Sequence, residues 1–215
     1  MCAGAALDPV EHLRAADPIL RALIDHVAVN GLRDSRAGRP QDHYGALVRS
    51  IVGQQLSTTA ARAIYGRLTE RFGGRTPTPQ EVLADDPDGL RIAAGLSHAK
   101  VRYLRSLAEH VIAGGLELDR LETLPDDEVI AELTAVKGIG TWSAHMFLMF
   151  HLQRPDILPV GDLGIRRAMM IQYDLPGRSS QLPDPATMEQ LAEPWRPYRS
   201  LACRYLWRSL EATPV

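Results

Sequence analysis

Apolar residues recur along most of the chain at intervals of three and four, the spacing that places them on one face of an α-helix. The clearest case is the segment 44–55, where Leu47, Val48, Ile51 and Val52 form one apolar stripe. No segment alternates apolar and polar residues with the period of two that is typical of a half-buried strand. The pattern therefore predicts an all-α protein.

Capping residues, prolines and glycines divide this pattern into separate helices. Asp17-Pro18 opens a helix, because Asp is a favoured N-cap and proline is tolerated at the first helical position. Ser57 and Ser97 can cap the helices that follow them. We expect helices at about 18–29, 44–55, 58–72, 80–83, 87–94, 98–113, 125–137, 141–151, 163–173, 187–192 and 198–210.

The chain has no clean linker, internal repeat or low-complexity tract. We therefore expect residues 1–215 to form a single unit of two intimately packed helical lobes. Lobe one would hold about 45–150, and lobe two about 1–44 plus 151–215.

Composition narrows the function classes. No stretch reaches the roughly 18 apolar residues that span a bilayer, and no targeting signal is visible, so we expect a soluble, cytoplasmic protein with no membrane partner. The only two cysteines, Cys2 and Cys203, exclude a four-cysteine iron–sulfur cluster. No His/Glu spacing fits a zinc site, so we expect no metal cofactor.

Charge is segregated along the chain. The formal net charge of -2 taken alone argues mildly against nucleic-acid binding. Acidic residues, however, concentrate in 85–88 and 117–132, whereas basic residues gather elsewhere, almost all of them arginine. This segregation is compatible with a basic surface that binds nucleic acid on an otherwise neutral protein. It is equally compatible with charged helix faces that are only exposed to solvent.

The segment 133–144 reads as a helix, a tight hairpin and a second helix. Gly138 and Gly140 allow positive φ angles and close approach to another backbone, and Ile139 between them can plug the core. The amides of Gly138, Gly140 and Thr141 would then point outward at a helix N-terminus, an arrangement that attracts a phosphate. The alternative is a glycine turn that holds no ligand.

A carboxylate follows this hairpin at a defined distance. Asp162 comes 22 residues after Gly140, behind a loop shaped by Pro159 and Gly161, and it stands where a helix begins. The helix dipole there favours an ionised carboxylate, and Gly161 and Gly164 leave room for a bulky ligand beside it. The alternative is that Asp162 is only an N-cap.

The hairpin and the aspartate together resemble the helix-hairpin-helix (HhH-GPD) DNA glycosylase superfamily, whose signature is a Gly-x-Gly hairpin followed by a Pro-rich loop and an Asp. The similarity also covers 51–57, 95–100 and 195–200, so it runs over roughly residues 17 to 210. It implies a DNA-binding helix-hairpin-helix, an active-site cleft between the lobes and Asp162 as the catalytic carboxylate.

The lysine content indicates the branch of this family. Members that also nick the backbone carry a Schiff-base lysine just after the hairpin, and the matching position here is Trp142. The only lysines are Lys100 and Lys137, and Lys137, which precedes the hairpin, is expected to face a phosphate. The chain therefore resembles the monofunctional 3-methyladenine DNA glycosylase II type, in the short form without the N-terminal β-domain.

The resemblance also suggests how DNA and base are held. An extruded nucleotide leaves a gap, and the residue that fills it would lie on the Gln54-Gln55-Leu56 turn, with Gln55 preferred. Trp142 and Trp195 match the aromatics that stack on the base, and Tyr44 is a weaker candidate. Trp207 is expected to pack in the core. A monovalent cation on the hairpin carbonyls is compatible with the resemblance.

The predicted reaction is base excision repair of alkylated purines in double-stranded DNA, by base flipping and hydrolysis of the N-glycosidic bond. An alkylated base is cationic and leaves readily, so one ionised carboxylate can stabilise the oxocarbenium-like sugar and place a water. We expect a monomer. Three alternatives remain open: a glycosylase for another damaged or mismatched base, a non-catalytic DNA-binding module, and a helical adaptor for another protein.

Overall fold

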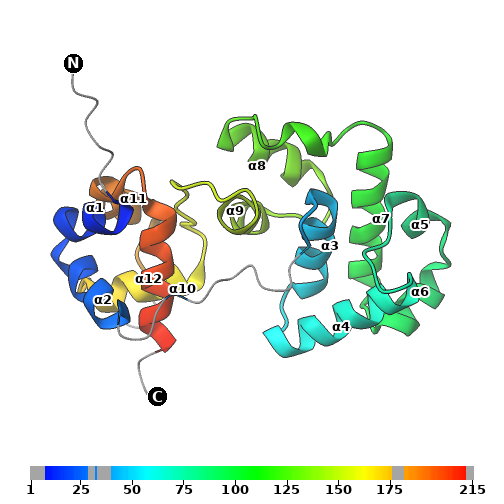
Figure 1. The fold of residues 1–215 in the computed structure, drawn as a ribbon, viewed down its shortest axis with the longest axis horizontal. Coiled ribbons are helices and arrows are strands. Elements are labelled where there is room, and N and C mark those ends of the chain that lie inside the picture. The colour runs from blue at the N-terminus through cyan, green and yellow to red at the C-terminus, as the bar shows by residue number, and fades with distance from the viewer. Residues whose placement is uncertain (1–7, 29–31, 33–39, 176–181, 212–215) are drawn as a thin grey trace. The chain divides into compact units, whose positions relative to one another are not determined.

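The computed structural model describes residues 8–28, 32, 40–175 and 182–211, and every regular element in those ranges is helical. The chain folds into two compact units. Unit 2 comprises residues 36–152, and unit 1 comprises the described parts of 1–35 and 153–215 (Figure 1). The division falls at 35/36 and 152/153, whereas the sequence suggested boundaries near 44/45 and 150/151.

Unit 2 is built around one apolar helix. It contains α3 (His43–Gly53), α4 (Thr58–Arg71), α5 (Pro79–Ala84), α6 (Pro87–Ala94), α7 (His98–Ile112), the 3-10 turn η1 (Leu118–Arg120), α8 (Asp126–Ala135) and α9 (Thr141–Phe150). Helix α3 contacts α4, α7 and α9, and its predicted stripe of Leu47, Val48, Ile51 and Val52 is fully buried.

Unit 1 is organised by the last helix. It contains α1 (Pro9–Ala16), α2 (Pro18–Ala28), α10 (Leu163–Gln172), α11 (Pro185–Ala192), the 3-10 turn η2 (Glu193–Trp195) and α12 (Arg199–Glu211). Helix α12 contacts α1, α2 and α10, so residues from both ends of the chain meet in one core (Figure 1). Ala202, Cys203 and Leu206 of α12 are fully buried there. Cys2 lies outside the described residues.

Local capping signals account for most helix ends. Ser57, Ser97 and Asp162 accept from the backbone amides three residues on, as the sequence predicted. Helix α1 is not among the helices expected from the sequence, although Asp8-Pro9 repeats the signal of Asp17-Pro18, and Asp8 accepts from Val10 and Glu11. No helix among the described residues is long and apolar enough to cross a membrane.

Candidate functional site

The hairpin between α8 and α9 packs against the aromatic ring of Tyr103. Val136 and Ile139 are buried, and the Ile139 amide donates to the Val136 carbonyl at 3.0 Å. Gly138 has φ +94, and a Cβ built there would collide with the ring of Tyr103 on α7. Only glycine therefore fits at position 138. The sequence suggested that another backbone segment would approach this glycine closely, whereas in the structure the Tyr103 ring does so.

The N-terminus of α9 differs from most helix starts among the described residues; α8 also lacks a side-chain cap, but its first turn carries three acidic residues. Asp, Ser or Thr side chains cap α1, α3, α4, α5, α6, α7, α10 and α11. The N-cap of α9 is Gly140, with no side-chain cap and no acidic residue in the first turn. Gly140, Thr141 and Lys137 are exposed, and a Cβ at Gly140 would meet no atom within 4 Å. A helix start of this kind suits an anion from outside the chain.

The two predicted DNA-facing glutamines have different surroundings. The side-chain amide of Gln54 donates to the Gly138 carbonyl at 2.8 Å, and it lies 3.4 Å from the Ser143 hydroxyl. Gln54 therefore fastens the end of α3 to the hairpin, a role that the sequence does not indicate. Gln55 is exposed and has φ +57, a left-handed conformation that is uncommon for a residue other than glycine. Leu56 beside it is 37% exposed.

Tyr44 and Trp142 are the two residues of unit 2 that we predicted to line a base pocket. They lie near opposite ends of α3, Tyr44 on α3 itself and Trp142 on α9. Trp142, in the first turn of α9, is 46% exposed. Its end of α9 meets the end of α3 through Gln54, whereas His43 at the start of α3 lies 2.7 Å from His151 beyond the end of α9. Tyr44 is next to His43, about 15 Å along the helix from Gln54. The structure does not bring Tyr44 and Trp142 to the same end of α3.

Tyr44 nevertheless carries an unusual polar atom. Its ring is buried, and its hydroxyl has no hydrogen-bond partner among the residues that the structure describes. Burial raises the pKa of this phenol well above its usual range. A buried polar atom without a partner is uncommon in folded proteins.

The two lysines have different surroundings: Lys100 bonds to a backbone carbonyl, and Lys137 lies on the surface. The Lys100 ammonium donates to the Val52 carbonyl at 2.8 Å, which satisfies an acceptor in the last turn of α3. Burial lowers the pKa of Lys100. Lys137 is exposed at the hairpin. Burial likewise lowers the pKa of His145, one turn beyond Trp142 on α9, which favours the neutral imidazole.

Asp162 in unit 1 is the N-cap of α10, and it is only 7% exposed. Its Oδ1 accepts from the Ile165 amide at 2.7 Å and from the indole nitrogen of Trp207 at 2.9 Å. The Asp caps of α1, α3, α6 and α11 are exposed, whereas Asp17, which caps α2, is as buried as Asp162. Asp162 is thus a buried carboxylate held by two elements, which goes beyond an ordinary cap. A buried carboxylate of this kind can stabilise a developing positive charge.

The space beside Asp162 is not as open as the sequence suggested. A Cβ at Gly161 would meet nothing within 4 Å, which agrees with the expected room. A Cβ at Gly164 would lie 3.1 Å from Asp162 Oδ1 and 3.1 Å from two indole atoms of Trp207. Gly164 therefore makes room for Trp207, not for a ligand.

Trp195 is a core residue of unit 1. It has no exposed surface, and its indole nitrogen donates to Oδ2 of the buried Asp17 at 2.8 Å. The Tyr173 hydroxyl donates to the same oxygen at 2.6 Å, and burial raises the Tyr173 pKa. Because no face of the ring is open, the burial argues against the prediction that Trp195 stacks on a base.

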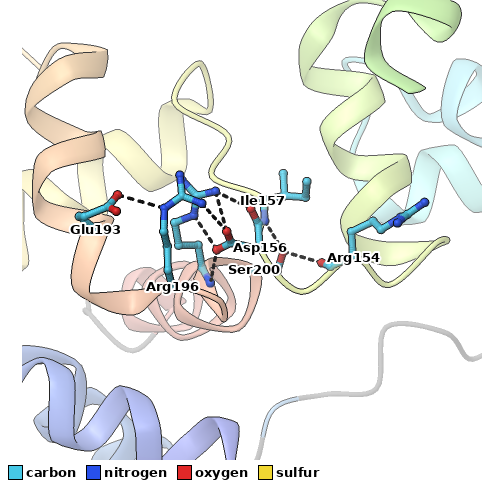
Figure 2. A network of polar contacts seen from close by, with 7 residues as sticks. Arg154, Asp156, Ile157, Glu193, Arg196 and Ser200 are labelled. Carbon is cyan, nitrogen blue, oxygen red and sulfur yellow. Dashed lines mark hydrogen bonds and ion pairs between the residues drawn. The ribbon is translucent and has the colours of Figure 1, made fainter. Parts of the chain in front are cut away.

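A charged network holds the loop that leads to Asp162. Asp156 accepts from Arg199 at 2.7 Å and from Arg196 at 2.6 Å, and Arg196 also pairs with Glu193 (Figure 2). The Ser200 hydroxyl accepts from the Ile157 amide at 2.9 Å and donates to the Arg154 carbonyl at 2.7 Å (Figure 2). These bonds tie the loop to the start of α12, the helix that carries Trp207.

The residues predicted to form the functional site thus fall into two groups, one in each unit. In unit 2 the hairpin brings Lys137, Gly138, Gly140 and Thr141 together with Trp142, and Gln54 is fastened to them. In unit 1 Asp162 stands with Trp207, which the sequence alone assigns to the core because no local signal links two residues 45 positions apart. Among the described residues, no group of three His, Cys, Asp or Glu side chains could hold a metal ion.

Comparison with known proteins shows one family. The family described as HhH-GPD superfamily base excision DNA repair protein matches residues 48–197. Schizosaccharomyces pombe DNA-3-methyladenine glycosylase 1 is 34% identical over 200 residues, which are 92% of this chain and 85% of that protein. A Saccharomyces cerevisiae DNA-3-methyladenine glycosylase is 31% identical over 229 residues, covering 92% and 77%.

Solved structures agree with the sequence comparisons. The S. pombe 3-methyladenine DNA glycosylase in complex with abasic DNA superposes with a TM-score of 0.81 at 32% identity, covering 95% of this chain and 97% of that one. A Bacillus halodurans DNA-3-methyladenine glycosidase gives a TM-score of 0.76 at 35% identity, covering 95% and 89%.

Proposed function

Since the chain belongs to the HhH-GPD superfamily of base excision DNA repair proteins, we propose that it is a monofunctional DNA glycosylase that hydrolyses the N-glycosidic bond of alkylated purines, such as 3-methyladenine, in double-stranded DNA. The observation that carries this proposal is the match, over 97% of its length, to a 3-methyladenine glycosylase described with abasic DNA, which is the product of such a reaction.

The hairpin supports the DNA-binding part of the proposal. The uncapped start of α9, with Gly140 and Thr141, would bind a backbone phosphate through main-chain amides, and the exposed Lys137 would add a charge contact. Such contacts read no sequence, as a repair enzyme that scans DNA requires. Gln55 would fill the gap left by the extruded nucleotide, and its exposed position and left-handed backbone support that role.

Trp142 supports the choice of a cationic base. Its half-exposed indole offers a π-face, which attracts a positively charged ring such as an alkylated purine. The neighbouring His145, whose pKa is lowered by burial, adds no positive charge that would repel this substrate at neutral pH. Tyr44, with its unpartnered hydroxyl, remains a weaker candidate for a ligand contact.

Asp162 would supply the electrostatics of bond cleavage. As the base departs with the bonding electrons, positive charge develops on the sugar, and a preorganised carboxylate stabilises it. Water then adds to the anomeric carbon and loses a proton, which leaves an abasic site and a neutral free base. A cationic purine needs little help from an acid, so the Asp162 carboxylate would suffice for this step.

The lysines support a monofunctional reaction. The position after the hairpin is Trp142, and Lys100 is engaged with the Val52 carbonyl at 2.8 Å. A Schiff base, and with it strand cleavage, is therefore not expected. We propose in addition that the protein acts as a monomer in the cytoplasm, associated with the nucleoid if the source is prokaryotic.

A monovalent cation at the hairpin is compatible with the donors present. The Val136 carbonyl accepts from Ile139 and the Gly138 carbonyl from Gln54, and each carbonyl oxygen has a second lone pair. Such an ion would strengthen phosphate binding. None of the bond-breaking steps above depends on it.

The decisive experiment compares the wild type with Asp162→Asn on methylated duplex DNA and identifies the released bases by chromatography. We expect free methylated purine from the wild type, abasic sites left uncut, and a loss of roughly a hundredfold or more in rate for Asp162→Asn. Binding to abasic DNA should survive the substitution.

Other outcomes point elsewhere. Release of a different damaged base would keep the enzyme class and change the substrate. Tight DNA binding without release of any base would favour a non-catalytic DNA-binding module. Equal excision by the wild type and Asp162→Asn would remove Asp162 from the mechanism.

A further inference from the structure

Trp207 occupies a position that core packing alone does not explain. It is not among the fully buried residues of unit 1, and its indole nitrogen lies 2.9 Å from Oδ1 of Asp162. The ring crosses from α12 to the first turn of α10, and these two helices contact each other. We propose that Trp207 is a positioning residue, which holds the Asp162 carboxylate in the orientation that the excision reaction needs; this inference rests on the proposed function.

The geometry around the carboxylate supports this role. Oδ1 of Asp162 receives two donors from different elements, the Ile165 amide of its own helix at 2.7 Å and the Trp207 indole of α12. The amide bond is the local contact that makes Asp162 an N-cap. The indole donor restrains the same oxygen from another helix, outside the segment that carries Asp162. Fixed orientation is what lets a charged group act without reorganising as the reaction proceeds.

The glycine at position 164 supports it as well. A Cβ there would lie 3.1 Å from Asp162 Oδ1, from Trp207 Cδ1 and from Trp207 Nε1. Glycine within a helix costs stability relative to alanine. Gly164 therefore makes the first turn of α10 less stable, but it leaves room for the Trp207 indole to contact the Asp162 carboxylate.

Helix α12 is itself anchored near the loop of Asp162. Arg199 and Ser200 at its start bond to Asp156, Ile157 and Arg154, in the loop that runs to Asp162 (Figure 2). The helix that carries the indole and the loop that carries the carboxylate are thus joined at both ends.

The test measures single-turnover excision from methylated duplex DNA by the wild type, Trp207→Phe, Asp162→Asn and the double variant. Trp207→Phe keeps an aromatic ring and removes the N–H donor. We expect it to slow excision roughly 10- to 100-fold, as misplacement of a catalytic group does, with affinity for abasic DNA unchanged within about twofold. In the Asp162→Asn background the same change should cost nothing further, because the indole acts through the carboxylate.

Two further variants separate positioning from folding. Gly164→Ala retains every donor but crowds the indole and the carboxylate, so it should slow excision while leaving affinity for abasic DNA unchanged within about twofold. Tyr173→Phe removes a donor from the other buried carboxylate of unit 1, Asp17, and should leave the excision rate unchanged.

The outcomes are distinguishable. A Trp207→Phe rate within twofold of the wild type overturns the inference, and so does an equal loss in the Asp162→Asn background, which would indicate a general structural effect. A wild type that releases no methylated base refutes the proposed function, and the inference falls with it. Slow excision by Trp207→Phe alone, with normal binding, supports both.

Discussion

At the scale of single residues, Gly138 and Gly140 of the hairpin have different structural roles. Gly138 has φ +94 and faces the ring of Tyr103, whereas Gly140 has φ -97 and open space where a Cβ would go. Gly138 therefore serves the fold, and Gly140 leaves the start of α9 accessible.

Alanine at the two positions should separate these duties. We expect Gly138→Ala to lower the free energy of unfolding by about 2–4 kcal/mol, through left-handed strain and overpacking against Tyr103. Gly140→Ala should change it by less than about 1 kcal/mol, yet weaken binding to abasic DNA because the methyl group obstructs the phosphate. Urea denaturation and DNA titration would measure both effects. Equal stabilities for the two variants would contradict this assignment.

At the scale of elements, the loop from 153 to 161 has no regular structure, and its shape depends on α12. The Ser200 hydroxyl satisfies the buried Ile157 amide and donates to the Arg154 carbonyl. Asp156, held by Arg196 and Arg199, adds a charged anchor to the same stretch (Figure 2). The position of Asp162 is therefore set from outside its own segment.

Ser200→Ala tests this dependence. The substitution leaves the Ile157 amide buried without an acceptor, which should cost about 1–3 kcal/mol of stability. Excision should also slow, because the loop positions Asp162. Thr134→Ala is a matched control: Thr134 is exposed and its hydroxyl bonds to carbonyls of its own helix, so the effect should stay within about 0.5 kcal/mol. Thermal unfolding and excision assays on both variants would decide, and normal excision by Ser200→Ala would show that the loop keeps its shape alone.

At the scale of the whole molecule, a protein of net charge -2 must bind DNA through local contacts rather than through its overall field. We expect the association constant for abasic DNA to fall as a power of salt concentration, with a slope of about 0.9 per phosphate contact. Lys137→Gln should reduce that slope by about one if Lys137 meets a phosphate.

Arg120→Gln provides the charge-matched control. It removes one positive charge from η1, within the acidic segment 117–132, and Arg120 is an exposed partner of Glu117. The slope should not change for this variant. An equal reduction in both variants would mean that net charge, and not a contact at the hairpin, governs binding.

The sequence by itself determined the helices, the hairpin and the family. The helix starts at Ser57, Ser97 and Asp162 follow from a side chain and an amide three residues apart, and the α3 stripe follows from the helical period. These signals are local, so they survive without knowledge of packing. Helix α1, which the sequence did not predict, carries the same kind of signal at Asp8-Pro9.

Only the tertiary structure decided the surroundings of the tryptophans and of Gln54. The sequence places Trp195 at a base and Trp207 in the core, whereas in the structure Trp195 is sealed against Asp17 and Trp207 bonds to Asp162. The partners are 178 and 45 residues apart in the chain, and Gln54 is 84 residues from the Gly138 carbonyl that it binds. Such contacts arise from the packing of α3 on α9, of α12 on α10 and of η2 on α1, and no spacing in the sequence encodes them.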